Sequence, residues 1–193
     1  MPFPLRAGCR RSPRGGWTLV EVAVTTAVGL IVLAAFVAIS LSINASMVAV
    51  GNYSDLDRAS RMTLDNLSRD IRNAAVVTNS SATSLTLVNT FSGTNLITYA
   101  WDGSSNVTRT ITMMTNGVPL AENSQVMLTS CDYLAFNYYI RIPTNGLQFL
   151  STTNCSGTNQ VKLVSVSWRC SRSVLGSKLN TESVQTANVT VRN

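Results

Sequence analysis

The sequence offers few side chains of the kinds that carry out catalysis. It contains no histidine, which excludes histidine-assisted serine or cysteine nucleophiles and histidine metal ligands. Asp102, Glu122 and Asp132 are scattered and show no pairing that would shift a pKa, which argues against general acid–base catalysis. The acids also form no clustered loop of the kind that binds calcium. We therefore expect a protein that is not an enzyme and that uses no cofactor or metal.

Cysteine is the other reactive residue type, with four copies. Cys9 lies in the N-terminal stretch, and Cys131, Cys155 and Cys170 lie in the C-terminal part. Without CxxC spacing, a structural bridge is favoured over a metal site, and an oxidising compartment would favour one disulfide among the last three. Pairing of the strands that flank Cys131 and Cys170 would bring the two residues together. The alternation of side chains along these strands, however, places the two cysteines on opposite faces of the sheet. All three pairings stay open.

The most informative acid is Glu21, because of the charges around it. No charged residue follows it before Asp55, and the chain after the first 16 residues is too nearly neutral to indicate nucleic-acid binding. Most of the net charge of +6 comes from four arginines that precede any acid: Arg6, Arg10, Arg11 and Arg14. Glu21 thus stands at the border between a basic segment and a long uncharged one.

The uncharged segment predicts one membrane span. Its apolar centre, Val22–Ile43, would form ~33 Å of helix, which matches a bilayer core of ~30 Å. The preceding arginines predict a cytoplasmic N-terminus and a C-terminal body outside the cytoplasm. A removable secretory signal has a shorter apolar stretch of ~7–15 residues, although Asn44-Ala45-Ser46 would serve as a weak cleavage site. Glu21 at the border either reaches the lipid headgroups or has a partner that offsets its burial.

The order of these features is similar to that of a known family. A basic leader ends in Gly16, and Trp17-Thr18-Leu19-Val20-Glu21 opens the uncharged helix. This resembles the type IV prepilin family, including the pseudopilins of type II secretion systems. The sequence differs in having Trp17 where phenylalanine is commonest and Gly15 where a charged residue usually precedes the glycine. The resemblance implies that residues 1–16 are a leader and that prepilin peptidase cuts between Gly16 and Trp17.

The resemblance also implies roles and partners. Trp17 would be N-methylated after the cut, and Glu21 would be the acid required for methylation and for the register between subunits. Cutting creates an ammonium on Trp17, and pairing with a neighbouring subunit's ammonium would offset the burial cost of a carboxylate. The partners would be prepilin peptidase, other major and minor pilins or pseudopilins, and an inner-membrane assembly platform with its ATPase.

Beyond the span, the sequence predicts that the helix continues as an amphipathic half. We expect one helix from Trp17 to Ala75, with Gly29 and Gly51 as candidate bends. One face repeats every three or four residues and is expected to pack on a sheet: Leu56, Ser60, Thr63, Leu64, Leu67, Ile71, Ala74 and Ala75. The opposite face alternates in charge every four residues: Asp57, Arg61, Asp65 and Arg69.

The rest of the chain predicts a β-rich body. The expected divisions are a membrane half at 17–43, an amphipathic half at 44–76 and a periplasmic body at 77–193. Strands are expected at Ser84–Val88, Leu96–Trp101, Thr108–Met114, Tyr133–Ile142, Val161–Arg169 and Val184–Val191. Turns are expected at Ser92-Gly93, Asp102-Gly103, Asn116-Gly117 and Asn145-Gly146.

Alternation places one set of apolar residues on each of two inner faces: Leu134, Phe136, Tyr138 and Ile140, and Val164, Val166 and Trp168. The fold class is therefore α+β, with an antiparallel sheet packed on a long N-terminal helix.

Short fragments of the body indicate which members of this family the chain resembles. Leu67–Ala74, Ile97-Thr98-Tyr99, Leu134–Tyr138 and Val191-Arg192-Asn193 are similar in order to the J-type pseudopilin and the W-type minor pilin. The resemblance implies a minor subunit at the tip of a pilus or secretion pseudopilus. One alternative is a membrane-tethered periplasmic binding module that does not polymerise. Another is a processed secreted enzyme whose mature N-terminus lies near Ser46.

Overall fold

The structure is a computed structural model that describes residues 16–90, 94–115, 117–141, 149–156, 161–174 and 181–191. Residues 1–15 of the expected leader, including Cys9, lie outside this part of the chain, as do Asn116 and the expected turns at Ser92-Gly93 and Asn145-Gly146. The contacts divide the chain into two compact units, Met1–Asn44 and Ala45–Asn193. This boundary lies close to the expected end of the membrane half at Ile43.

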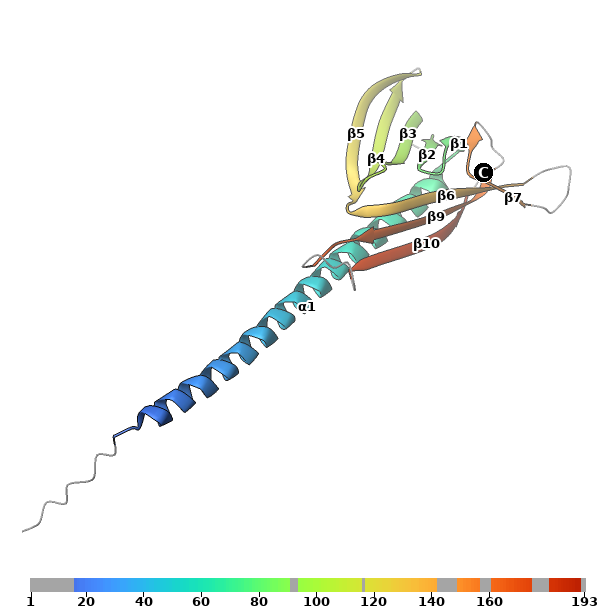
Figure 1. Cartoon of the computed structure of the whole chain (residues 1–193). Helices are drawn as coiled ribbons and strands as arrows, with labels where there is room; N and C mark the ends of the chain where they lie inside the picture. The colour runs from blue at the N-terminus through green and yellow to red at the C-terminus, as the bar shows by residue number, and fades with distance from the viewer. Residues whose placement is uncertain are drawn as a thin grey trace, which may run out of the picture. The chain divides into compact units, whose positions relative to one another are not determined.

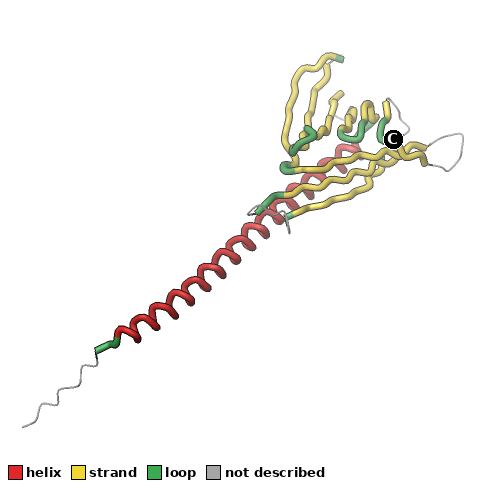
Figure 2. The backbone as a smooth tube through the Cα atoms, viewed as in Figure 1, coloured by secondary structure: helices red, strands yellow, loops and turns green. Residues whose placement is uncertain are grey.

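The long helix α1 spans Leu19–Asn73 and includes both Gly29 and Gly51 (red in Figure 2). It begins two residues later than expected because Thr18 caps it. The Thr18 carbonyl and hydroxyl oxygens both accept from the Glu21 amide, at 3.0 and 3.3 Å. The helix ends at Asn73 instead of Ala75, and the first strand begins at Val76, the last residue of the expected amphipathic half. The expected helix limits were therefore too wide by two residues at each end.

The second unit contains two antiparallel sheets, whereas the sequence indicated one (Figure 1). The larger sheet has the order β5-β4-β3-β2-β1-β8, and the smaller one has the order β10-β9-β6-β7. The larger sheet contains β1 Val76–Ser80, β2 Ser84–Asn89, β3 Thr94–Trp101, β4 Val107–Thr115, β5 Val118–Leu128 and β8 Cys155–Ser156. The smaller sheet contains β6 Cys131–Arg141, β7 Phe149–Thr152, β9 Val161–Ser171 and β10 Glu182–Thr190.

Six of these strands match the expected ones, and β1, β5, β7 and β8 were missed. β5 is an edge strand that is exposed from Val118 to Val126, so its sequence shows no alternation between buried and exposed residues. β7 and β8 are only 4 and 2 residues long. Strands this short depend on their neighbours rather than on a pattern of their own.

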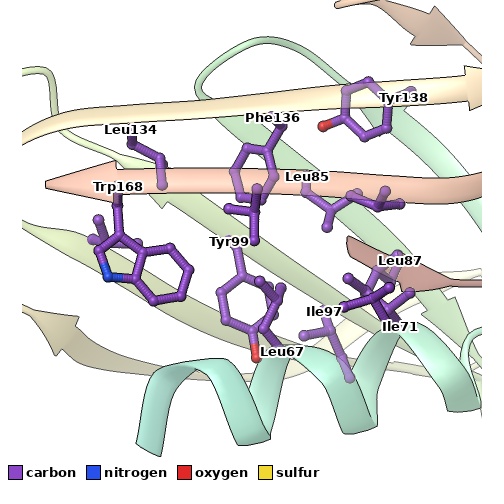
Figure 3. Packing of buried hydrophobic residues seen from close by; sticks show 14 of the residues in the cluster. Leu67, Ile71, Leu85, Leu87, Ile97, Tyr99, Leu134, Phe136, Tyr138 and Trp168 are labelled. Carbon is purple, nitrogen blue, oxygen red and sulfur yellow. The ribbon is translucent and has the colours of Figure 1, made fainter. Parts of the chain in front are cut away.

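Both sheets contribute to one core with the C-terminal half of α1. In Figure 3, Leu67 of α1 lies beside Tyr99 of β3, and Ile71 lies beside Leu87 of β2 and Ile97 of β3. Phe136 and Trp168 of the smaller sheet belong to the same core. Most of the expected helix stripe is buried: Leu56, Ser60, Thr63, Leu67, Ile71 and Ala74. Leu64 and Ala75 are half-buried. The two expected inner strand faces are buried as well, except that Ile140 is only partly covered. The α+β fold and the packing of antiparallel strands on the amphipathic half of the helix are therefore confirmed.

Candidate functional site

The residues expected at the cleavage site lie directly before α1. Gly16 and Trp17 precede the helix, and the Trp17 side chain is 71% exposed. Glu21 lies in the first helical turn and is also exposed. The amide dipoles at a helix N-terminus favour a negative charge at this position. An exposed backbone junction and an exposed carboxylate are thus separated by less than two helical turns.

The helix that follows presents apolar side chains on all sides. From Leu19 to Asn44 every residue is exposed except Ser40, which is half-buried. In the described residues, α1 is the helix that is long and apolar enough to cross a membrane. Exposed apolar surface of this extent requires a cover, and lipid or other apolar helices can provide it.

Three hydroxyl groups in this half donate to carbonyls of the helix itself. The Thr25 hydroxyl donates to the Glu21 carbonyl at 2.9 Å, and the Thr26 hydroxyl donates to the Val22 carbonyl at 2.9 Å. Ser40 donates to the Phe36 carbonyl at 2.9 Å. Because these donors already have acceptors, they add little cost when the helix enters an apolar environment.

The charged face of the amphipathic half forms only part of the expected ladder. Arg61 donates to the Asp57 carboxylate at 2.8 Å, one helical turn away. Arg69 instead donates to the amide oxygen of Asn66, at 2.7 Å. Asp65 is exposed. An exposed pair of this kind contributes ~0.3–0.5 kcal/mol, so this face contributes little to stability.

A buried ion pair joins α1 to the larger sheet. The Asp70 carboxylate accepts from the Tyr99 hydroxyl at 2.7 Å and from the Arg109 guanidinium at 2.8 Å. The Asp70 and Arg109 side chains are only 7% and 16% exposed. Burial, followed by the charge of Asp70, raises the pKa of Tyr99 far above its ordinary value, so the phenol remains a hydrogen-bond donor. The three groups satisfy one another at the helix–sheet contact.

A neutral hydrogen bond joins α1 to the smaller sheet. The Trp168 indole N–H donates to the Ser60 hydroxyl at 3.2 Å, and that hydroxyl lies 3.4 Å from the Ser183 hydroxyl. All three side chains are buried. The same helix is therefore connected to the larger sheet through Asp70 and to the smaller sheet through Ser60.

The cysteines are placed differently from one another. Cys131 in β6 and Cys170 in β9 are direct partners in the register of the smaller sheet, and both are free and buried. The disagreement in alternation that the sequence suggested is wrong, because a β-bulge between Cys131 and Tyr133 adds Asp132 and restores the parity. The Cys155 backbone lies in β8 of the larger sheet, opposite Ser80.

Of the three scattered acids, Asp102 and Asp132 have structural roles near their own positions, and Glu122 is exposed on β5. The Asp102 carboxylate accepts from the backbone N–H groups of Ser104, Ser105 and Asn106 at 2.7–3.0 Å. Led by the Asn106 amide, these bonds hold the Asp102 pKa well below its usual range. Asp132 pairs with Arg169 at 2.8 Å. In the described part of the chain, no three His, Cys, Asp or Glu residues gather in a group that could hold a metal ion.

Sequence reasoning missed the helix–sheet connections made by Ser60 and Asp70. A signal was present for Asp70, because it stands three residues after Leu67 and next to Ile71, on the apolar stripe. A carboxylate at such a position requires a buried partner. Nothing in the sequence pointed to Arg109 as that partner, since it comes from a distant strand.

No protein-family model matches the chain, and no curated protein matches it. The assignment of a function therefore depends on the residues and contacts described above.

Proposed function

We propose that this protein is a non-enzymatic filament subunit, a minor pilin or pseudopilin of the type IV prepilin class. In this proposal, prepilin peptidase cuts between Gly16 and Trp17, Trp17 is methylated, and the processed chain waits in the bacterial inner membrane. The N-terminus faces the cytoplasm and the β-rich body lies in the periplasm. An assembly platform with its ATPase then moves the chain into a pilus or secretion pseudopilus, at the tip.

The observation that carries the proposal is the position of Glu21. It is an exposed acid in the first turn of a helical half whose other side chains are uncharged and, except for Ser40, exposed through Asn44. A simple membrane anchor gains nothing from an acid beside its span, because the acid adds a cost if it moves into the bilayer. A subunit that must match its register to a neighbour does gain, because the acid can pair with the neighbour's Trp17 ammonium.

The exposed apolar half supports the same proposal. In the membrane this surface contacts lipid, and in a filament it contacts the corresponding helices of other subunits. The exchange of lipid for apolar helices is close to neutral in hydrophobic free energy, which allows one helix surface to serve both states. Hydroxyls that are bonded within the helix do not need to change partners during the transfer.

The decisive experiment compares Glu21→Gln with Asp65→Asn in the full chain. Both changes remove one exposed negative charge from α1, but only Glu21 lies at the proposed subunit contact. We expect Glu21→Gln to remain membrane-bound and to be lost from purified filaments, whereas Asp65→Asn is incorporated normally. Mass spectrometry of the wild-type N-terminus should find methylated Trp17.

Other outcomes identify the competing functions. Normal incorporation of Glu21→Gln would overturn the role of Glu21. A chain that keeps Arg6 to Arg14 and never enters filaments would instead be a membrane-tethered binding module. A mature N-terminus near Ser46 would identify a secreted protein.

A further inference from the structure

Cys131 and Cys170 are two buried thiols that lie directly opposite each other on adjacent antiparallel strands. Directly opposed residues in such a pair have Cα atoms roughly 4.5–5.5 Å apart. This separation lies within the range of roughly 4.4–6.8 Å that a disulfide requires. The Asp132 bulge is what brings the two side chains to the same face of the sheet.

Cys131 and Cys170 do not exchange a pair of backbone hydrogen bonds with each other. The Cys131 amide donates to the Ser105 carbonyl at 2.8 Å, and the Cys131 carbonyl accepts from the Trp101 indole at 3.3 Å. Both bonds go to the larger sheet and its loops. Opposed residues without ladder bonds between them have the closer of the two Cα spacings found in antiparallel sheets. The thiols therefore face each other where the backbones approach most closely.

The electrostatics of the pair favour a reactive Cys131. A hydrogen bond from the Cys170 thiol lowers the pKa of Cys131, while this same bond and burial raise the pKa of Cys170. Because the thiolate is the attacking form in disulfide exchange, the directions of these shifts make Cys131 the better nucleophile of the two.

We propose that Cys131 and Cys170 form the disulfide of the mature protein, and that Cys155 keeps its thiol. The pairing follows from the fold, and only the oxidising compartment in which it forms depends on the proposed function. The oxidant is an external disulfide, such as that of a thiol–disulfide oxidoreductase. The Cys131 thiolate attacks this disulfide and expels one thiolate, and Cys170 then attacks the Cys131 sulfur and expels the second. Two electrons pass to the oxidant, whose two sulfurs take up the two protons.

The bridge would close the point at which the chain crosses from one sheet to the other. Ser130, between β5 and β6, has a positive φ of 58°, and its carbonyl accepts from the Ser171 amide at 2.8 Å. Since Cys170 precedes Ser171, the bridge and this hydrogen bond hold the same crossing. Cys131 and Cys170 are each 1% exposed, so an external oxidant must reach them while β9 closes onto β6 or when this strand pair opens.

The test uses the full chain: the cells are lysed in denaturant together with an alkylating reagent, so that buried free thiols are also blocked, and the protein is digested without reduction. We expect one linked peptide pair that contains Cys131 and Cys170. Cys155→Ser should retain this pair, and Cys170→Ser should lose it and leave Cys131 alkylated. A linked pair that includes Cys155 in the wild-type protein would overturn the proposal. A linked pair between Cys131 and Cys155 that is found only in the Cys170→Ser variant would support it, because Cys131 would have taken a new partner after losing its native one.

A second condition separates this proposal from the proposed function. Purified, denatured chain is refolded with oxidised glutathione and digested in the same way. If the cellular protein is fully reduced but the refolded protein links Cys131 to Cys170, the pairing stands and the periplasmic location fails. If neither sample contains the linked pair, the pairing is wrong, whatever the result of the Glu21 experiment.

Discussion

The two halves of α1 are both rich in apolar residues, yet their side chains are in opposite environments. Leu33 in the first half is 63% exposed, whereas Leu67 in the second half is 1% exposed. The first half is apolar all round, and the second has one apolar stripe with charges opposite. The distribution of apolar residues around the helix, rather than their number, therefore separates a surface for lipid and helices from a face that forms a core.

Polar groups follow the same division. In the first half, the hydroxyls of Thr25, Thr26 and Ser40 bond to the carbonyls of their own helix. In the second half, Ser60 and Asp70 bond to strands. The first half is thus self-contained, and the second half is completed only by the sheets.

The largest expected effect comes from breaking the ion pair of the packed half. Asp70→Ala should lower the free energy of unfolding of the β-rich body by about 3–5 kcal/mol, because it leaves the Arg109 charge buried without a partner. Denaturant unfolding of the full chain in detergent, followed by tryptophan fluorescence, measures this loss. Adding Arg109→Met to Asp70→Ala should recover part of it.

The matched control for this change is Asp57→Ala, which removes an exposed ion pair from the same helix. Its expected cost is below about 1 kcal/mol. Equal costs for Asp57→Ala and Asp70→Ala would contradict the assignment of the buried pair as the connection to the larger sheet.

A charge placed in the exposed half should affect membrane insertion rather than folding. Leu33→Lys should make insertion about 3–4 kcal/mol less favourable, because the cost of the lysine adds to the loss of the leucine. Met62→Lys, at a residue that is 55% exposed in the packed half, should leave insertion unchanged. Partitioning of the full chain between vesicles and buffer measures both. Equal partitioning of the two variants would contradict the assignment of only the first half of α1 to the membrane.

The smallest expected effect is on the neutral connection to the smaller sheet. Ser60→Ala removes the acceptor of the buried Trp168 indole and should cost about 1–2 kcal/mol in unfolding free energy. Ser54→Ala, on an exposed part of the same helix, should change it by less than about 0.5 kcal/mol. Urea unfolding can resolve the two, and a Ser60→Ala cost as small as that of Ser54→Ala would show that the hydrogen bond is dispensable.

Local pattern predicted much of the fold. The stripe from Leu56 to Ala74 and the alternation of Leu134, Phe136 and Tyr138 identified core faces correctly, because each reflects a single period of secondary structure. The division into two sheets was not predictable in this way. It depends on Ser130, whose positive φ turns the chain out of β5, and no residue type at that position announces it.

Less of the site could be predicted. The order of Gly16, Trp17 and Glu21 is local and visible in the sequence, and their roles remain predictions. Asp70 with Arg109, and Cys131 with Cys170, are contacts between residues far apart in the chain. The Cys131–Cys170 contact also requires the Asp132 bulge, which shifts the alternation by one residue and made the strand pattern misleading.

The two connections of α1 also have a mechanical consequence. Ser60 and Asp70 are ten residues apart, or ~15 Å along the helix, and each attaches to a different sheet. A pull along the axis would load both attachments in shear at once instead of peeling them one after the other. Traction on the helix would therefore be shared between the two sheets, and we expect the loss of either attachment to lower the force at which the body unfolds.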